Sequence, residues 1–134
     1  MNPEFDAVSL LDAARAVRSR AHAPYSQFAV GAALLLEDGS IVNGVNVENR
    51  TFGLTVCAER TAIASAVAAG MRSFVAIAIS AERAAPCPPC GACRQVMAEF
   101  APDLPVILEG PDGKPVETSL GHLLPMQFDL PPRP

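Results

Sequence analysis

Four cysteines in two clusters constrain this chain more than any other feature of its sequence. Cys57 stands alone, whereas Cys87, Cys90 and Cys93 follow one another at intervals of three residues. A pair of cysteines separated by two residues, joined by a cysteine from a distant segment, is a spacing typical of zinc sites. A fold that uses this spacing must bring two well-separated segments of the chain together at one point.

Helical and strand patterns alternate around these cysteines. We expect helices over residues 6–20, 57–69, 91–100 and 119–124, and strands over 28–36, 41–47, 74–80, 105–109 and 116–118. The turn at 37–40 has Asp-Gly at its centre, which is typical of a hairpin. Strand–helix–strand alternation in the middle of the chain predicts a partly parallel sheet covered by helices. The sequence therefore predicts an α/β fold, a three-layer α/β/α sandwich with a mixed five-stranded sheet.

Length and charge narrow the class of protein. The 134 residues fit one domain spanning 1–134, and the net charge of −4 argues against nucleic acid as a partner. It also argues against a polybasic membrane contact, and no apolar run is long enough to span a bilayer. The first residues do not form a signal peptide, so we expect a cytoplasmic protein. In that reducing compartment four cysteines indicate metal binding or catalysis rather than disulfides.

Two arrangements of the cysteines around a metal are open. All four could form a closed structural site, or three could bind and leave the fourth position to water, as in catalytic zinc sites. The second is favoured, because Cys90 and Cys93 lie three residues apart at a predicted helix start and Cys57 begins another helix. Two helix N-termini directed at one point favour thiolates there. Cys87 precedes two prolines that hold the chain extended, and we expect it not to be a ligand.

Two charged residues that follow Cys57 support a catalytic site. Glu59 falls in the first helical turn, where it could take a proton from an activated water and pass it on. Three thiolates leave a zinc site with a negative charge, which weakens its effect on water. Arg60, or secondarily Arg94, could offset that charge by donating hydrogen bonds to the sulfurs. The alternatives are an ordinary first-turn glutamate and surface arginines.

These motifs resemble the cytidine deaminase family in its short, zinc-dependent form. Zinc deaminases pair His-x-Glu with Pro-Cys-x-x-Cys, and here Cys57-Ala58-Glu59 and the segment from Pro89 to Cys93 stand in those places. A cysteine as the first ligand is typical of the enzymes that act on free nucleosides. The resemblance covers nearly the whole chain and includes 23–26, 46–49, 53–60, 90–96 and 123–125. Departures are Gln27, the stretch 50–52 and the extra Cys87.

The resemblance implies a role for each residue around the metal. One Zn²⁺ per subunit would be held by Cys57, Cys90 and Cys93. Glu59 would be the acid and base of catalysis, and Arg60 would contact the ligand sulfurs.

The resemblance also implies how a substrate is bound. Asn46 and Glu48 would bind the ribose hydroxyls, and Phe28 would line the pocket for the base. Backbone groups near Ala58 and Cys90 would hold the edge of the base. Phe128 would reach the active site of a neighbouring subunit, because the short family members are homotetramers.

The implied activity is the hydrolytic deamination of cytidine and 2′-deoxycytidine to the corresponding uridines in pyrimidine salvage, with release of ammonia. Two other hypotheses remain open. The first is a deaminase of another small aminopyrimidine such as blasticidin S, against which the ribose motif of Asn46 and Glu48 argues. The second is a non-enzymatic module with a structural four-cysteine zinc site, against which Glu59 argues.

Overall fold

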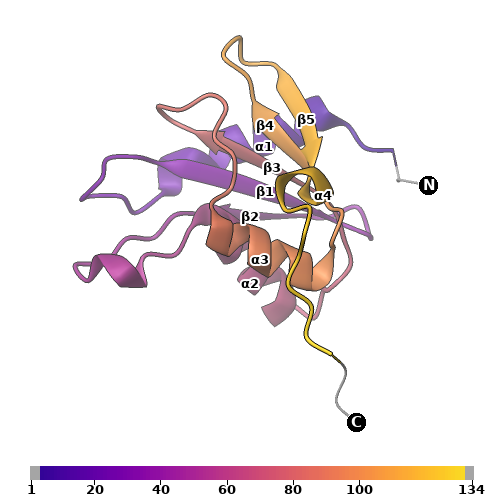
Figure 1. Cartoon of the computed structure of the whole chain (residues 1–134). Helices are drawn as coiled ribbons and strands as arrows, with labels where there is room; N and C mark the ends of the chain where they lie inside the picture. The colour runs from indigo at the N-terminus through magenta and orange to yellow at the C-terminus, as the bar shows by residue number, and fades with distance from the viewer. Residues whose placement is uncertain (1–3, 132–134) are drawn as a thin grey trace.

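The elements of the fold alternate along the chain much as the sequence predicts (Figure 1). The computed structural model describes residues 4–131, so both ends of the predicted domain, 1–3 and 132–134, lie outside the described residues. The helices are α1 (Ala7–Val17), α2 (Ala58–Ala68), α3 (Gly91–Phe100) and α4 (Leu120–Leu123), with short 3₁₀ turns at Arg18–Arg20 and Phe52–Leu54. The strands are β1 (Val30–Leu36), β2 (Ile41–Val45), β3 (Phe74–Ala81), β4 (Pro105–Glu109) and β5 (Pro115–Ser119). Within residues 4–131 no helix combines the length and the apolar character that crossing a membrane requires.

The strands form one five-stranded sheet in the order β2-β1-β3-β4-β5. The β3–β4 pair is parallel, whereas β1 pairs antiparallel with β2 and β3, and β4 pairs antiparallel with β5. Parallel neighbours need a crossover connection, and α3 provides it between β3 and β4. The mixed sheet expected from the sequence is confirmed.

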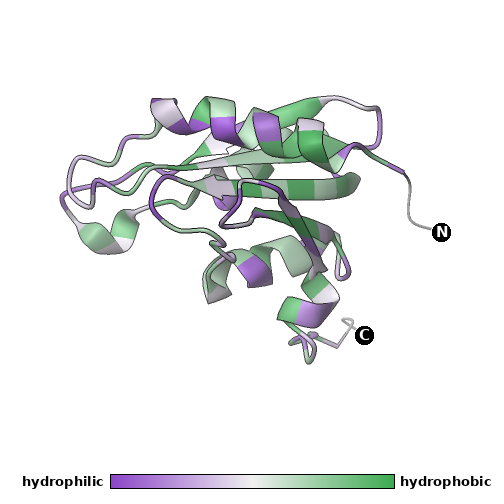
Figure 2. Cartoon of the chain, turned by 90° about the horizontal axis from the view of Figure 1, so that it is seen from above, coloured by the Kyte–Doolittle hydropathy of each residue, from purple (hydrophilic) through white to green (hydrophobic). Residues whose placement is uncertain are grey.

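Helices cover both faces of this sheet, which makes the three-layer sandwich. On one face α1 packs Leu10, Leu11 and Ala14 against small and branched side chains of the central strands. On the opposite face α2, α3 and α4 pack against a larger apolar cluster that includes Leu34 and Ile77. Figure 2 shows the helix next to the N-terminus on one side of the sheet and the remaining helices on the other.

Two glycines let the helices approach the sheet closely. A Cβ at Gly31 would lie 2.1 Å from the carbonyl oxygen of Ala14 in α1. A Cβ at Gly44 would lie 2.2 Å from the carbonyl oxygen of Ala58, at the start of α2. Contacts this short do not occur between real atoms, so a larger residue would push the helix away. Gly44 therefore sets the first turn of α2, which carries Glu59, directly against the edge strand β2.

Candidate metal centre

Three of the four cysteines lie at the starts of α2 and α3. Cys57 is the N-cap of α2 and Cys90 is the N-cap of α3, and neither side chain accepts a capping hydrogen bond. Cys93 is the third residue of α3 and is completely buried. The positive ends of the two helix dipoles therefore meet at these sulfurs and favour thiolates there.

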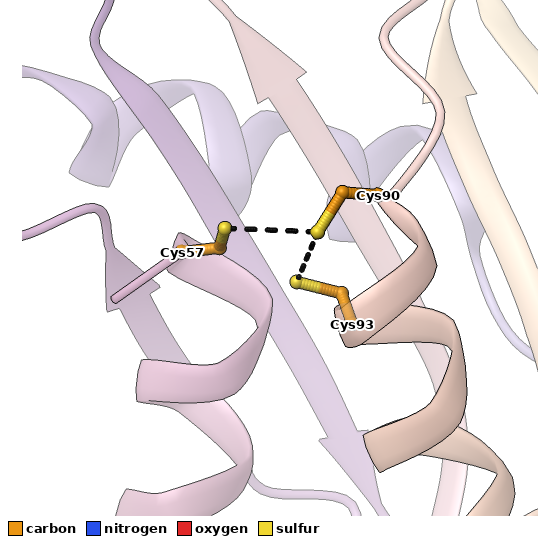
Figure 3. Close-up of side chains that lie close together, drawn as sticks. All are labelled: Cys57, Cys90 and Cys93. Atoms are coloured by element: carbon orange, nitrogen blue, oxygen red, sulfur yellow. Dashed lines mark hydrogen bonds between the residues drawn. The ribbon is translucent and has the colours of Figure 1, made fainter. Parts of the chain in front are cut away.

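The sulfurs of these three cysteines form a compact group (Figure 3). The Sγ atoms of Cys57 and Cys90 are 3.9 Å apart, and those of Cys90 and Cys93 are 3.4 Å apart. All three lie within 4.8 Å of one another. Tetrahedral zinc with Zn–S bonds of about 2.3 Å holds its sulfur ligands about 3.8 Å apart. The chemistry and the spacing of the three donors thus fit one zinc ion.

The fourth cysteine lies outside this group. Cys87 is half-buried and packs against the apolar cluster between the sheet and α3, where it acts as a small hydrophobic side chain. Burial raises the pKa of its thiol above the ordinary value, and the negative charges of Glu59, Cys57 and Cys90 add to this. The expectation that Cys87 is not a ligand stays a prediction, and this placement supports it.

Arg60 contacts the sulfur group, whereas Arg94 does not. Nη2 of Arg60 lies 3.5 Å from Sγ of Cys57 and 3.4 Å from the carbonyl oxygen of Thr55. The pKa of the Cys57 thiol is lowered first by its hydrogen bond with Cys93 and then by Arg60. Arg94 instead donates to two carbonyl oxygens, those of Pro89 and Leu123, each at 2.8 Å. Arg94 thereby ties the start of α3 to the end of α4.

Glu59 is a buried carboxyl next to the sulfurs. Its exposed fraction is 5 %, and Ala58 beside it is fully buried at the first position of α2. Burial raises the pKa of Glu59, and the charge of Cys57 adds to the shift. A buried carboxyl with a raised pKa is suited to acid–base chemistry.

The two predicted ribose ligands hold the segment that precedes β1. The amide of Asn46 donates through Nδ2 to the carbonyl oxygen of Phe28 at 2.7 Å and accepts from the N–H of Val30 at 2.9 Å. The carboxylate of Glu48 accepts from the N–H groups of Tyr25 and Ser26 and from the Ser26 hydroxyl. The Ser26 hydrogen bond is the main cause that lowers the pKa of Glu48.

Ser26 is a site residue whose part the sequence reasoning did not assign. Its hydroxyl donates a hydrogen bond to Glu48 and accepts one of 3.0 Å from the N–H of Phe28. The available signal was a serine after Pro24-Tyr25, since short hydroxyl side chains often bond to nearby backbone in turns.

A cavity lies beside Glu48. Its volume is about 310 Å³, and it is lined by Tyr25, Ser26, Phe52 and Thr55 as well as Glu48. The rings of Tyr25 and Phe52 meet edge to face, with centroids 5.5 Å apart. This size is at the lower end of the range for small-molecule sites.

Phe128 is not brought to the cysteines of its own chain. It is 74 % exposed and lines a separate cavity with Gln95, Ala98 and Glu99 of α3. Its expected contact with a neighbouring subunit therefore stays a prediction.

Comparisons with known proteins place this geometry in context. The model of the cytidine and deoxycytidylate deaminase zinc-binding region matches residues 6–108. A cytidine deaminase of Halalkalibacterium halodurans is 50 % identical over 124 residues, 92 % of this chain and 94 % of that protein. The crystal structure of a cytidine deaminase from Burkholderia pseudomallei is 51 % identical, with a TM-score of 0.87 over 92 % of this chain and 100 % of that one. A blasticidin-S deaminase of Bacillus cereus is 36 % identical over 74 % of this chain and 76 % of that protein.

Proposed function

Because the chain belongs to the cytidine and deoxycytidylate deaminase family, we propose that it hydrolyses cytidine and 2′-deoxycytidine to the corresponding uridines and ammonia. It is a zinc-dependent hydrolase that acts on a C–N bond. The observation that carries this assignment is a group of three cysteine sulfurs at two helix starts, with a buried carboxyl beside it.

Each residue of the centre has a part in this reaction. Cys57, Cys90 and Cys93 hold one zinc ion per subunit. When bound, zinc supplies the Lewis acid that makes water a nucleophile near neutral pH. Arg60 donates a hydrogen bond to the Cys57 sulfur and so offsets the negative charge of three thiolates.

Glu59 moves the protons. Its carboxylate takes one proton from the attacking water and delivers it to N3 of the ring, while the oxygen bonds to C4. Glu59 then moves the remaining proton of that water from the C4 hydroxyl to the exocyclic nitrogen, the C4–N bond breaks, ammonia leaves and a carbonyl remains at C4. Burial of Glu59 excludes bulk water, which would otherwise compete for these protons.

The proposed nucleoside site includes Glu48, which lines the cavity described above. We propose that Asn46 and Glu48 bind the ribose hydroxyls and that Phe28 forms one wall for the base. Backbone groups near Ala58 and Cys90 hold the edge of the base. Support comes from the position of Glu48 in the wall of that cavity. A ribose site favours a nucleoside over blasticidin S as the substrate.

The activity can be tested by following the loss of cytidine ultraviolet absorbance together with the metal content of the protein. We expect turnover of cytidine and 2′-deoxycytidine, its loss with a zinc chelator and its return with added zinc. Cytosine, which lacks the ribose, and blasticidin S should react far more slowly. A preference for blasticidin S would contradict the nucleoside assignment. A fully zinc-loaded protein without turnover of any of these compounds would indicate the non-enzymatic zinc module.

We also propose that the chain acts as a homotetramer of single-domain subunits in the cytoplasm, whose reducing conditions keep the ligand thiols free for zinc. An apolar cavity of about 510 Å³ on the outer side of α2 and α3 supports association. It is lined by Val56, Ile63, Val67, Val96 and Phe100 among others. Exposed apolar surface of this kind is typical of interfaces.

If the chain forms a tetramer, its mass in solution is that of four chains, and Phe128 of one subunit completes the active site of its neighbour. Light scattering at micromolar concentration measures this mass. A monomer at that concentration would contradict the assembly.

A further inference from the structure

Every polar group of Ser26 is engaged, in four hydrogen bonds with three residues. Its N–H and its hydroxyl donate to Glu48, and the hydroxyl also accepts from the N–H of Phe28. Its carbonyl oxygen accepts a hydrogen bond of 2.9 Å from Nη2 of Arg83. A carboxylate and a guanidinium therefore both bind Ser26, the first at its N–H and hydroxyl and the second at its carbonyl oxygen.

The segment that these groups hold has an unfavourable backbone conformation. Gln27 has a φ of 54°, in the left-handed region that residues other than glycine seldom adopt. Such a conformation persists only where surrounding contacts determine it. The carbonyl that Arg83 binds belongs to the peptide unit immediately before Gln27.

The backbone next to Arg83 is held to the sheet. The N–H of Glu82, just after β3, donates to the carbonyl oxygen of Ala29 at 2.9 Å, which joins the end of β3 to the start of β1. From there the guanidinium carbon of Arg83 lies 6.0 Å from the centre of the Phe28 ring. An arginine at this distance over an aromatic face is attracted to it. Arg83 thus contacts both the backbone of the segment and its aromatic side chain.

We infer that Arg83 is a positioning residue for nucleoside binding, which together with Glu48 holds Ser26 and Phe28 in place. This inference rests on the proposed function, in which Phe28 forms a wall for the base and Glu48 binds the ribose. Arg83 contacts neither the cysteines nor Glu59 in the part of the chain that the structure describes. It therefore acts on the formation of the binding site and not on the proton transfers.

The kinetic test is Arg83→Ala. Loss of one hydrogen bond and one cation–π contact should raise the KM for cytidine by about fivefold or more, with kcat within about twofold of the wild type. Arg83→Lys retains a cation and a donor and should recover part of the increase. Arg72→Ala is the matched control, because it removes the same charge just before β3 instead of just after it.

A second measurement does not depend on activity. The chain has one tyrosine, Tyr25, and no tryptophan, so its tyrosine emission reports directly on this segment. Acrylamide should quench Tyr25 more strongly in Arg83→Ala than in the wild type or in Arg72→Ala, because the segment is less ordered.

The outcomes separate the inference from the proposed function. An Arg83→Ala protein with wild-type KM and wild-type Tyr25 quenching would overturn the positioning role while leaving the deaminase activity intact. An equal rise in KM in Arg72→Ala would overturn it as well, since loss of charge alone would then explain the effect. A wild-type protein without cytidine turnover would refute the proposed function, and Tyr25 quenching would then decide whether Arg83 holds the segment.

Discussion

Replacing Glu59 with glutamine is expected to reduce the kcat for cytidine by about 10²- to 10⁴-fold, the usual contribution of a general acid–base group. Glutamine has the same shape, so it fits the buried position, whose exposed fraction is 5 %. Its amide cannot accept the proton of the attacking water or deliver it to the ring. The sulfur ligands are unchanged, and the zinc content should stay at that of the wild type.

The measurement pairs initial rates with metal analysis and a thermal melting curve. Glu117→Gln is a matched control, because Glu117 is exposed on β5 at the sheet edge opposite β2 and undergoes the same chemical change. It should retain full activity. Substantial turnover by Glu59→Gln with zinc still bound would show that another group carries the protons.

The second large effect is expected for Cys93→Ser, which should lose zinc and with it all measurable turnover. Cys93 is completely buried, and its sulfur lies 3.4 Å from that of Cys90. A serine hydroxyl is shorter and stays protonated near neutral pH, so it does not replace a thiolate ligand. Metal analysis after dialysis should find close to one zinc per wild-type chain and almost none in the variant.

Cys87→Ser provides the matched control within the same segment. Cys87 lies outside the group of three sulfurs, so this variant should keep its zinc and its activity. Loss of zinc from Cys87→Ser would instead indicate a closed site with four cysteine ligands.

Most of the secondary structure follows from local patterns. Asp6 begins α1 as predicted, because its carboxylate accepts from the N–H groups of Val8 and Ser9. The Asp-Gly turn joins β1 and β2, and Gly70 follows α2 with a positive φ of 87°. Capping and turn chemistry act over a few residues, so the sequence is sufficient to locate them.

Two strands are each two residues shorter than predicted, for a tertiary reason. The apolar pattern extends the first strand back to Phe28 and the second forward to Val47, but β1 begins at Val30 and β2 ends at Val45. The Asn46 side chain bonds to the backbone of the neighbouring segment at this point. Val47 instead forms isolated bridges with residues outside the sheet. A side chain that replaces part of a backbone ladder leaves no mark in the hydrophobic pattern.

Long-range packing also separates two arginines that the sequence offers for the same role, with Arg60 favoured over Arg94. Arg60 lies three residues after Cys57 and Arg94 lies directly after Cys93, and in the structure Arg94 donates instead to the carbonyl oxygens of Pro89 and of Leu123 at the end of α4. The contact between Arg83 and Ser26 joins segments that lie far apart in the chain. No local spacing indicates such a pair.

The sequence by itself determined the chemistry of this protein: three soft sulfur donors, a carboxyl two residues after the first of them, and two helix starts to carry them. These features depend on residue type and on short intervals, which local structure preserves. The tertiary structure alone decided which groups meet. The close contact of α2 with Gly44 and the crossover through α3 set the distances between the sulfurs. The hydrogen bond from Arg83 to Ser26 forms where the end of β3 meets the start of β1. Such contacts are governed by the packing of the whole chain, because the energy of a contact depends on distance in space and not on separation in sequence.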